Sequence, residues 1–225
     1  MTRNQIATII AIIFHAIGLA GMAFIDRELF VKATPFHLLL MAALLFYTQR
    51  RINWAFLLFF IVCFVAGFLV EWLGTSTGML FGNYAYGTAL GYKYKEVPLL
   101  IGVNWFIIMY CCGCTIQMFF SRLAAATGDE QIKTSKLVRW LSVVLDGALL
   151  AVIIDWFLEP AAIKLGYWRW LGSGEVPWFN YSSWFVVSAL LLTIFQWLPF
   201  GRHNKFALHL LLIQVMFFLL VKVFL

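Results

Sequence analysis

Long apolar stretches alternate with short polar connections along the whole chain, and this pattern defines the predicted elements. Most stretches have the roughly 20 residues that a helix needs to cross the hydrocarbon core of a bilayer. The second stretch is the weakest, because its clean apolar run, 36–47, is short and Lys32 must extend its side chain to the interface. The pattern predicts an all-α fold, a polytopic membrane bundle of about seven transmembrane helices. The stretches lie at about 5–24, 30–48, 54–73, 98–120, 138–158, 181–200 and 206–225.

Composition supports a membrane protein and excludes a soluble domain. Hydrophobic residues make up 64% of the chain and charged residues 12%, and the mean hydropathy is +0.92. Soluble domains carry about 25% charged residues. We therefore expect residues 1–225 to form a single integral-membrane domain. The net charge of +6 reflects basic residues that flank the membrane, so it implies no nucleic-acid partner.

The basic residues indicate how the predicted helices are oriented. Nine lie on the side of the amino terminus and seven on the opposite side, and the most basic connection, 121–137, belongs to the first group. The positive-inside rule then places the amino terminus in the cytoplasm. The first group is Arg3, Arg50, Arg51, Arg122, Lys133, Lys136, Arg139, Arg202 and Lys205, and the second is Arg27, Lys32, Lys93, Lys95, Lys164, Arg169 and Lys222.

An acidic motif occurs twice in this apolar chain. Glu71 is followed eleven residues later by Gly82 and an aromatic connection, and Asp155 is followed at the same distance by Gly166 and a second aromatic connection. Four anchors recur in the same order, although the spacer from glycine to proline differs in length. The later anchors are Val97-Pro98 with Trp105-Phe106 in the first copy, and Val176-Pro177 with Trp184-Phe185 in the second.

This duplication predicts an internal parallel repeat with units at about 54–120 and 138–200. We expect predicted helices 3–4 to superpose on helices 5–6, with a site where the two halves meet. Both acidic motifs fall on the outer side of the membrane under the orientation above. A carboxylate in each copy indicates acid chemistry or the binding of a cation.

Asp155 and Glu159 are the leading catalytic candidates. They lie four residues apart, so they share one face at the outer end of a predicted helix, which we expect Pro160 to terminate. Two adjacent carboxylates repel each other when both are ionised, so one of them can keep a proton and act as a general acid. Glu71 occupies the matching place in the other copy. The alternative is a solvated helix end without a catalytic role.

Asp146 lies outside this group. It precedes Asp155 by nine residues, which on a helix places it about 13 Å deeper and on the opposite side. We interpret Asp146 as the anchor of a helix contact or as a proton relay.

Aromatic residues and one amide complete the candidate site. Aromatic faces stabilise cations, although tryptophan and tyrosine also collect at membrane interfaces without a function. Asn104 and Ser183 lie six residues after the two prolines, and Asn104 is a further catalytic candidate because its amide can orient a water molecule. The candidate substrate-binding residues are Trp72, Trp156, Tyr84, Tyr86, Tyr167, Trp168, Trp105 and Trp184.

The sequence predicts no metal and no cofactor. The four histidines are too scattered for an iron-binding membrane enzyme, and no acidic pair of the type that binds diphosphate through magnesium is present. Lys222 lies three residues from the carboxyl terminus and has no acidic counter-ion on its helix, which argues against a retinal protein.

Several ordered motifs resemble the integral-membrane carotenoid biosynthesis proteins, the carotenoid 1,2-hydratases of the bisanhydrobacterioruberin hydratase and gamma-carotene hydratase types. The resemblance covers roughly residues 60–200. The motifs are Glu71-Trp72-Leu73-Gly74-Thr75, Phe81-Gly82-Asn83-Tyr84-Ala85-Tyr86, Pro98-Leu99-Leu100-Ile101-Gly102-Val103-Asn104-Trp105, Asp155-Trp156-Phe157-Leu158-Glu159-Pro160 and Gly166-Tyr167-Trp168.

This resemblance implies a reaction, a location and partners. The reaction is addition of water across the terminal C1=C2 double bond of an acyclic carotene. The location is the inner membrane of a prokaryotic cell. The partners are a long-chain carotene from the bilayer, water and other membrane enzymes of carotenoid synthesis. An extended C40 carotene is about as long as the hydrocarbon core is thick, around 30 Å, so its end reaches the depth of the acidic motifs.

Two alternatives remain open at the level of sequence. A carotene cyclase begins with the same protonation but lets a neighbouring double bond capture the cation. A transporter or lipid-binding scaffold would instead use the carboxylates for ion coupling.

Overall fold

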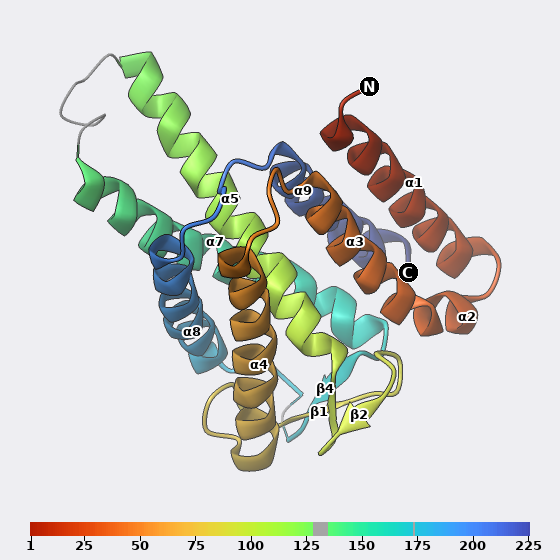
Figure 1. Ribbon diagram of the computed structural model, residues 1–225. Helices are drawn as coiled ribbons and strands as arrows, with labels where there is room; N and C mark the ends of the chain where they lie inside the picture. The colour runs from red at the N-terminus through yellow and green to blue at the C-terminus, as the bar shows by residue number, and fades with distance from the viewer. Residues whose placement is uncertain (128–134, 173) are drawn as a thin grey trace.

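The computed structural model describes residues 1–127, 135–172 and 174–225, and it confirms an all-helical membrane protein. Among these residues, six helices are long and apolar enough to cross a membrane (Figure 1). They are α1 (Arg3–Phe24), α4 (Trp54–Thr77), α5 (Leu100–Thr127), α7 (Lys136–Lys164), α8 (Trp178–Trp197) and α9 (Lys205–Phe224).

The second apolar stretch divides into two shorter helices, α2 (Arg27–Lys32) and α3 (Thr34–Thr48). The Asp26 carboxylate caps α2 by accepting from the Leu29 backbone N–H, and Pro35 occupies the first turn of α3. The 15 residues of α3 reach only about 22 Å at 1.5 Å per residue, less than the hydrocarbon thickness. The predicted count of seven transmembrane helices is therefore not confirmed.

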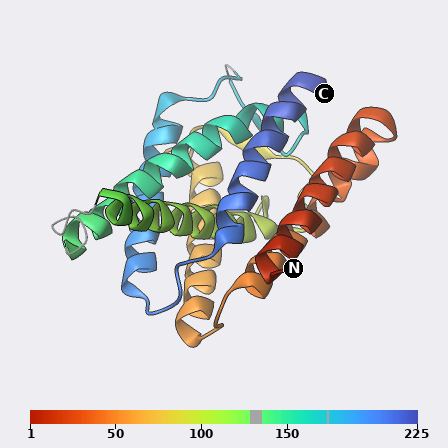
Figure 2. The same cartoon turned by 90° about the horizontal axis from the view of Figure 1, so that it is seen from above.

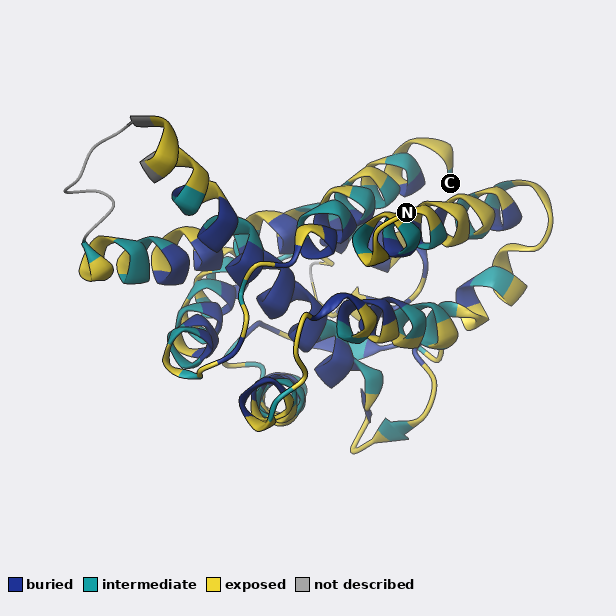
Figure 3. Cartoon of the chain, turned by 45° about the horizontal axis from the view of Figure 1, so that its top comes forward, coloured by how far each residue is buried: buried dark blue, intermediate teal, exposed yellow. Residues whose placement is uncertain are grey.

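Helix α5 forms the centre of the bundle. Of its apolar segment 78% is buried, against 28–33% for the other five helices, whose outward faces are exposed (Figure 3). Glycines allow this close packing, because a Cβ on Gly113 would lie 2.9 Å from the Phe195 ring of α8. Gly67 of α4 likewise leaves room for the Trp105 ring of α5.

The connections on the side of the acidic motifs contain short strands that the sequence did not predict. Strand β1 (Tyr84–Tyr86) pairs antiparallel with β4 (Trp168–Trp170), while β2 (Lys93–Tyr94) and β3 (Val97–Pro98) form a hairpin. Segments that match in the two copies of the motif thus pair directly with each other. These contacts place the two halves side by side, but the superposition of helix pairs stays a prediction.

Two predicted boundaries differ from the structure. Pro160 does not terminate its helix, because α7 continues to Lys164. The missing N–H of Pro160 removes one bond within the helix, and the helix ends only where the Leu165 and Tyr167 N–H groups bond the carbonyls of Ala161 and Ala162. Helices α5 and α7 also extend into the predicted basic connection 121–137, of which Lys133 lies outside the described residues.

Candidate active site

The carboxyl groups of Glu71, Asp155 and Glu159 line one small chamber of about 20 Å³. Glu71 comes from α4, and the other two come from successive turns of α7. All three side chains are buried, with exposed fractions between 1% and 5%. The structure therefore brings together the three acidic residues that the sequence selected. The other chamber residues are Phe81, Tyr84, Tyr86, Ile101, Asn104, Leu158, Trp168, Trp170, Asn180 and Trp184.

Glu71 is held by three hydrogen-bond donors. The hydroxyls of Tyr84 and Tyr86 donate to its Oε2 over 2.5 and 2.7 Å, and the Trp105 indole donates to its Oε1 over 2.9 Å. Residues two apart on a strand point to the same side, which is why both β1 tyrosines reach one oxygen. Both oxygens accept, as they do in an ionised carboxylate.

The two tyrosines remain donors under ordinary conditions. Burial, followed by the negative charge of Glu71, raises the pKa of the Tyr84 and Tyr86 hydroxyls well above the usual value. Both phenols therefore keep their protons and continue to stabilise the Glu71 carboxylate.

Glu159 is held in a similar way by the paired strand. The indoles of Trp168 and Trp170 on β4 donate to its Oε2 over 3.0 and 2.9 Å. An indole N–H is a donor only, so these contacts fix the orientation of the acceptor. Trp170 was missed as a site residue, although its place two residues after Trp168 mirrors Tyr86 after Tyr84.

Asp155 has a different environment. Among the described residues, its one hydrogen-bond donor is the Asn180 amide at the start of α8, 2.9 Å from Oδ2. Ser183, which matches Asn104 in the second copy of the motif, does not contact Asp155, because its hydroxyl bonds the Leu80 carbonyl oxygen. Asn180 was missed because the matching place in the first copy is Ile101, so the repeat contains no signal for it.

Two tryptophans from matching places in the two motif copies pack face to face behind the carboxyl groups. The rings of Trp105 and Trp184 are stacked with centroids 4.1 Å apart and an interplanar angle of 9°. Trp184 lines the chamber directly, whereas Trp105 contributes through its bond to Glu71. This stack joins α5 to α8 and holds the two halves of the chamber in register.

Trp72 and Trp156 lie away from the chamber. Trp156 is 58% exposed and contacts Phe157, and the Trp72 ring lies under the Lys95 ammonium at 4.0 Å. A residue next to a helical carboxylate points about 100° away from it, so neither indole turns toward the space that its neighbour lines.

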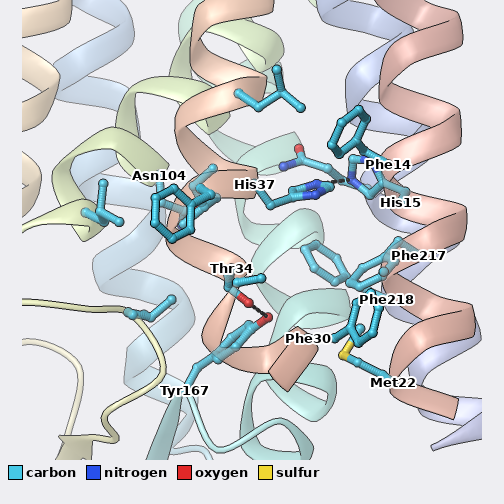
Figure 4. A pocket seen from close by; sticks show the side chains of 18 of the residues that line it. Phe14, His15, Met22, Phe30, Thr34, His37, Asn104, Tyr167, Phe217 and Phe218 are labelled. Carbon is cyan, nitrogen blue, oxygen red and sulfur yellow. Dashed lines mark hydrogen bonds between the residues drawn. The ribbon is translucent and has the colours of Figure 1, made fainter. Parts of the chain in front are cut away.

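A larger apolar cavity of about 300 Å³ adjoins the chamber (Figure 4). Helices α1, α3, α5 and α9 contribute most of its walls. Tyr167 lies here rather than in the chamber, and its hydroxyl is bonded to that of Thr34 at 2.8 Å. Burial raises the pKa of Tyr167 to about 12. The cavity and the chamber share four wall residues, Ile101, Asn104, Leu158 and Trp168.

The cavity also contains polar groups. The Nε2 atoms of His15 and His37 lie 3.3 Å apart, and His15 Nδ1 lies 2.7 Å from the Ala11 carbonyl oxygen (Figure 4). The Gln214 amide oxygen is buried and has no hydrogen-bond partner among the described residues. In the described part of the chain, no group of three metal-ligating side chains is arranged to hold an ion.

Comparison with known proteins points to one family. A family model described as carotenoid biosynthesis protein matches residues 33–225, which include every chamber residue but not α1. A bisanhydrobacterioruberin hydratase from Haloarcula japonica is 26% identical over 133 residues, covering 56% of this chain and 40% of that protein. The chain thus spans less than half the length of this relative. No solved structure matches.

Proposed function

Because the chain belongs to the carotenoid biosynthesis protein family, we propose that it is a carotenoid 1,2-hydratase acting on the end group of an acyclic carotene. The observation that carries this proposal is the convergence of Glu71, Asp155 and Glu159 on one buried chamber. Buried carboxyl groups are costly, so three of them in one small space are typical of a catalytic site. The apolar cavity beside the chamber supplies the binding site for a hydrocarbon end group.

The first step is proton transfer from Asp155. Its single amide donor leaves Asp155 more free acceptor sites for a proton than Glu71, which is surrounded by three donors. The proton goes to C2 of the terminal double bond, whose π electrons form the new C–H bond. A tertiary cation then remains at C1, and Asp155 becomes a carboxylate.

The chamber walls stabilise that cation. The Glu71 carboxylate is held in place by its donors before the reaction, so no reorganisation is required when positive charge develops. The faces of Trp168 and Trp184 add cation–π stabilisation without forming a covalent bond.

Water completes the reaction. Asn104 lies on the boundary between the chamber and the apolar cavity, where its amide can hold one water molecule near C1. The water oxygen bonds to C1 and releases a proton that returns to the Asp155 carboxylate, directly or by way of Glu159. The sum is one alkene and one water converted to a tertiary alcohol, with no redox change.

The test is product analysis with the purified protein and lycopene in lipid vesicles. We expect a product heavier by one water, and a wild-type reaction in deuterated water should place one deuterium on C2. An isomer of unchanged mass with a closed ring would instead identify a cyclase. Binding of lycopene without any product would identify a transporter or scaffold.

The proposed orientation places the amino terminus in the cytoplasm and the chamber near the outer face of the inner membrane of a prokaryotic cell. The excess of basic residues on the amino-terminal side supports it. A reporter enzyme that is active only outside the cytoplasm should be inactive when it is fused to the amino terminus. Activity of this fusion would show that the protein has the opposite orientation.

A further inference from the structure

A third space continues the series formed by the chamber and the apolar cavity. It is a groove of about 560 Å³ between α1 and α9, the two helices from opposite ends of the chain that lie side by side (Figure 2). The groove shares His15 and Phe217 with the apolar cavity, and the cavity shares four residues with the chamber. The three spaces therefore adjoin one another in order from the outside of the bundle to the carboxyl groups.

The surface of this groove is suited to hydrocarbon. Small side chains of α1, Ala16, Ala20 and Ala23, line it on one side, and leucine, isoleucine, methionine and phenylalanine side chains line the rest, with His15 as the one polar residue. Leu212 and Met216 on the α9 side are both 56% exposed, so the groove is open along its length. Both helices are apolar enough to cross a membrane, which directs this opening toward lipid chains.

The size of the apolar cavity makes an outlet necessary. At about 300 Å³ it lies at the lower limit of pockets that enclose drug-sized ligands, about 300–1,000 Å³. It can hold an end group but not a C40 chain about 30 Å long, the thickness of the hydrocarbon core. The chain of a long substrate must therefore leave the cavity through one of its walls.

The junction between cavity and groove is formed by a side-chain contact. The rings of His15 and Phe217 meet edge to face, with centroids 5.4 Å apart. On the cavity side, Gly18 leaves open space, because a Cβ added there would meet nothing within 4 Å. Gln214, whose amide oxygen has no hydrogen-bond partner among the described residues, also lines this space.

We propose that the α1–α9 groove is a lateral portal through which the apolar chain of the substrate enters from the bilayer. The chain then rests in the groove while its end group passes His15 and Phe217 and reaches the chamber. The identity of that chain as a carotene rests on the proposed function, whereas the route rests on the three adjoining spaces. The portal depends on α1, which lies outside the residues matched by the family model.

The test compares a long and a short ligand in variants of α1. Ala16→Trp places a large ring in the groove, while Ile13→Trp is a matched control on the same helix, 47% exposed and lining none of the three spaces. The ligands are lycopene and a ten-carbon acyclic isoprenoid diene that ends in the same double bond. Binding is measured by separating protein-bound from free ligand and quantifying the bound ligand by mass spectrometry, which detects both molecules.

We expect Ala16→Trp to weaken lycopene binding about tenfold or more, because the ring overfills the groove, and to leave the short diene within about twofold of wild type. Ile13→Trp should change neither. Gly18→Leu narrows the cavity itself and should weaken both ligands. Unchanged lycopene binding in Ala16→Trp, or equal loss of both ligands in that variant, would overturn the portal.

The same measurements separate this proposal from the proposed function. Binding requires no turnover. If Ala16→Trp selectively loses lycopene binding but the wild-type protein forms no alcohol, the portal stands and the proposed hydratase activity is refuted. Alcohol formation from lycopene with full activity in Ala16→Trp would keep the hydratase and refute the portal.

Discussion

The half of the chamber built by α4, β1 and α5 surrounds one carboxyl group with three donors, whereas the half built by α7, β4 and α8 distributes three donors over two carboxyl groups. The two halves of the chamber therefore differ in the number of hydrogen-bond donors for each carboxyl group. The first is suited to a fixed negative charge. The second leaves oxygen atoms of Asp155 and Glu159 that can hold, donate and recover a proton.

The strands make this comparison direct. Tyr84 pairs with Trp170 and Tyr86 with Trp168, so matching places in β1 and β4 each provide two donors to a carboxyl group. By spacing, Asp155 is the counterpart of Glu71, yet the β4 indoles bond Glu159, one helical turn later. This shift of one turn frees Asp155 from the strand and makes it available for proton transfer.

The largest expected effect follows removal of the proposed acid. Asp155→Asn retains the shape of the side chain but cannot donate a carboxylic proton, so lycopene hydration should fall by about 10²–10⁴-fold. Asp146→Asn is the matched control, because Asp146, which the sequence suggested as a helix anchor or proton relay, is exposed outside the chamber and accepts a hydrogen bond from Ser142 of its own helix. Near-normal turnover in Asp155→Asn would transfer the acid role to another carboxyl group.

The second prediction contrasts the two glutamates. Both Glu71→Gln and Glu159→Gln should reduce turnover, but only Glu71→Gln should also destabilise the fold, by about 1–3 kcal/mol. The reason is that donors face both oxygens of Glu71, so one of them would meet the new NH2 group, whereas the new amide at position 159 can turn its carbonyl oxygen toward both indoles. Thermal unfolding in detergent measures this difference, and equal midpoints would show that the two halves hold their carboxyl groups alike.

The third prediction separates proton transfer from water capture. In Asn104→Leu the cation should still form, since the carboxyl groups are intact, but water should no longer be held near C1. We expect deuterium in recovered lycopene from deuterated water, with little alcohol. Alcohol formation at the wild-type rate would leave Asn104 as a packing residue of α5.

The smallest effect is expected at Trp156. The sequence placed this indole beside the reacting end group, but the structure leaves it 58% exposed on the outer face of α7. Trp156→Leu should therefore keep hydration within about twofold of wild type, as exposed substitutions usually do. Trp168→Phe, which removes one donor to Glu159, should slow the reaction more. A larger loss of hydration in Trp156→Leu than in Trp168→Phe would show that Trp156 contributes to the site.

Much of the fold and part of the candidate site could be predicted from residue spacing. Stretches of about 20 apolar residues predict helices whatever their neighbours are, because the length follows from the thickness of the bilayer. Asp155 and Glu159 share a face because they are four residues apart on one helix. The second stretch and Pro160 departed from expectation, because the capping of α2 and the hydrogen bonds after Pro160 depend on local geometry.

The sequence by itself determined an all-helical membrane protein, its three candidate carboxyl groups and the family to which it belongs. Only the tertiary structure decided which donors hold each carboxyl group, that Asn180 serves Asp155, and that α1 and α9 form a groove next to the cavity. The physical reason is the separation along the chain of the residues that interact. Helix length and face depend on residues a few positions apart, whereas a hydrogen bond between distant segments depends on how whole helices pack.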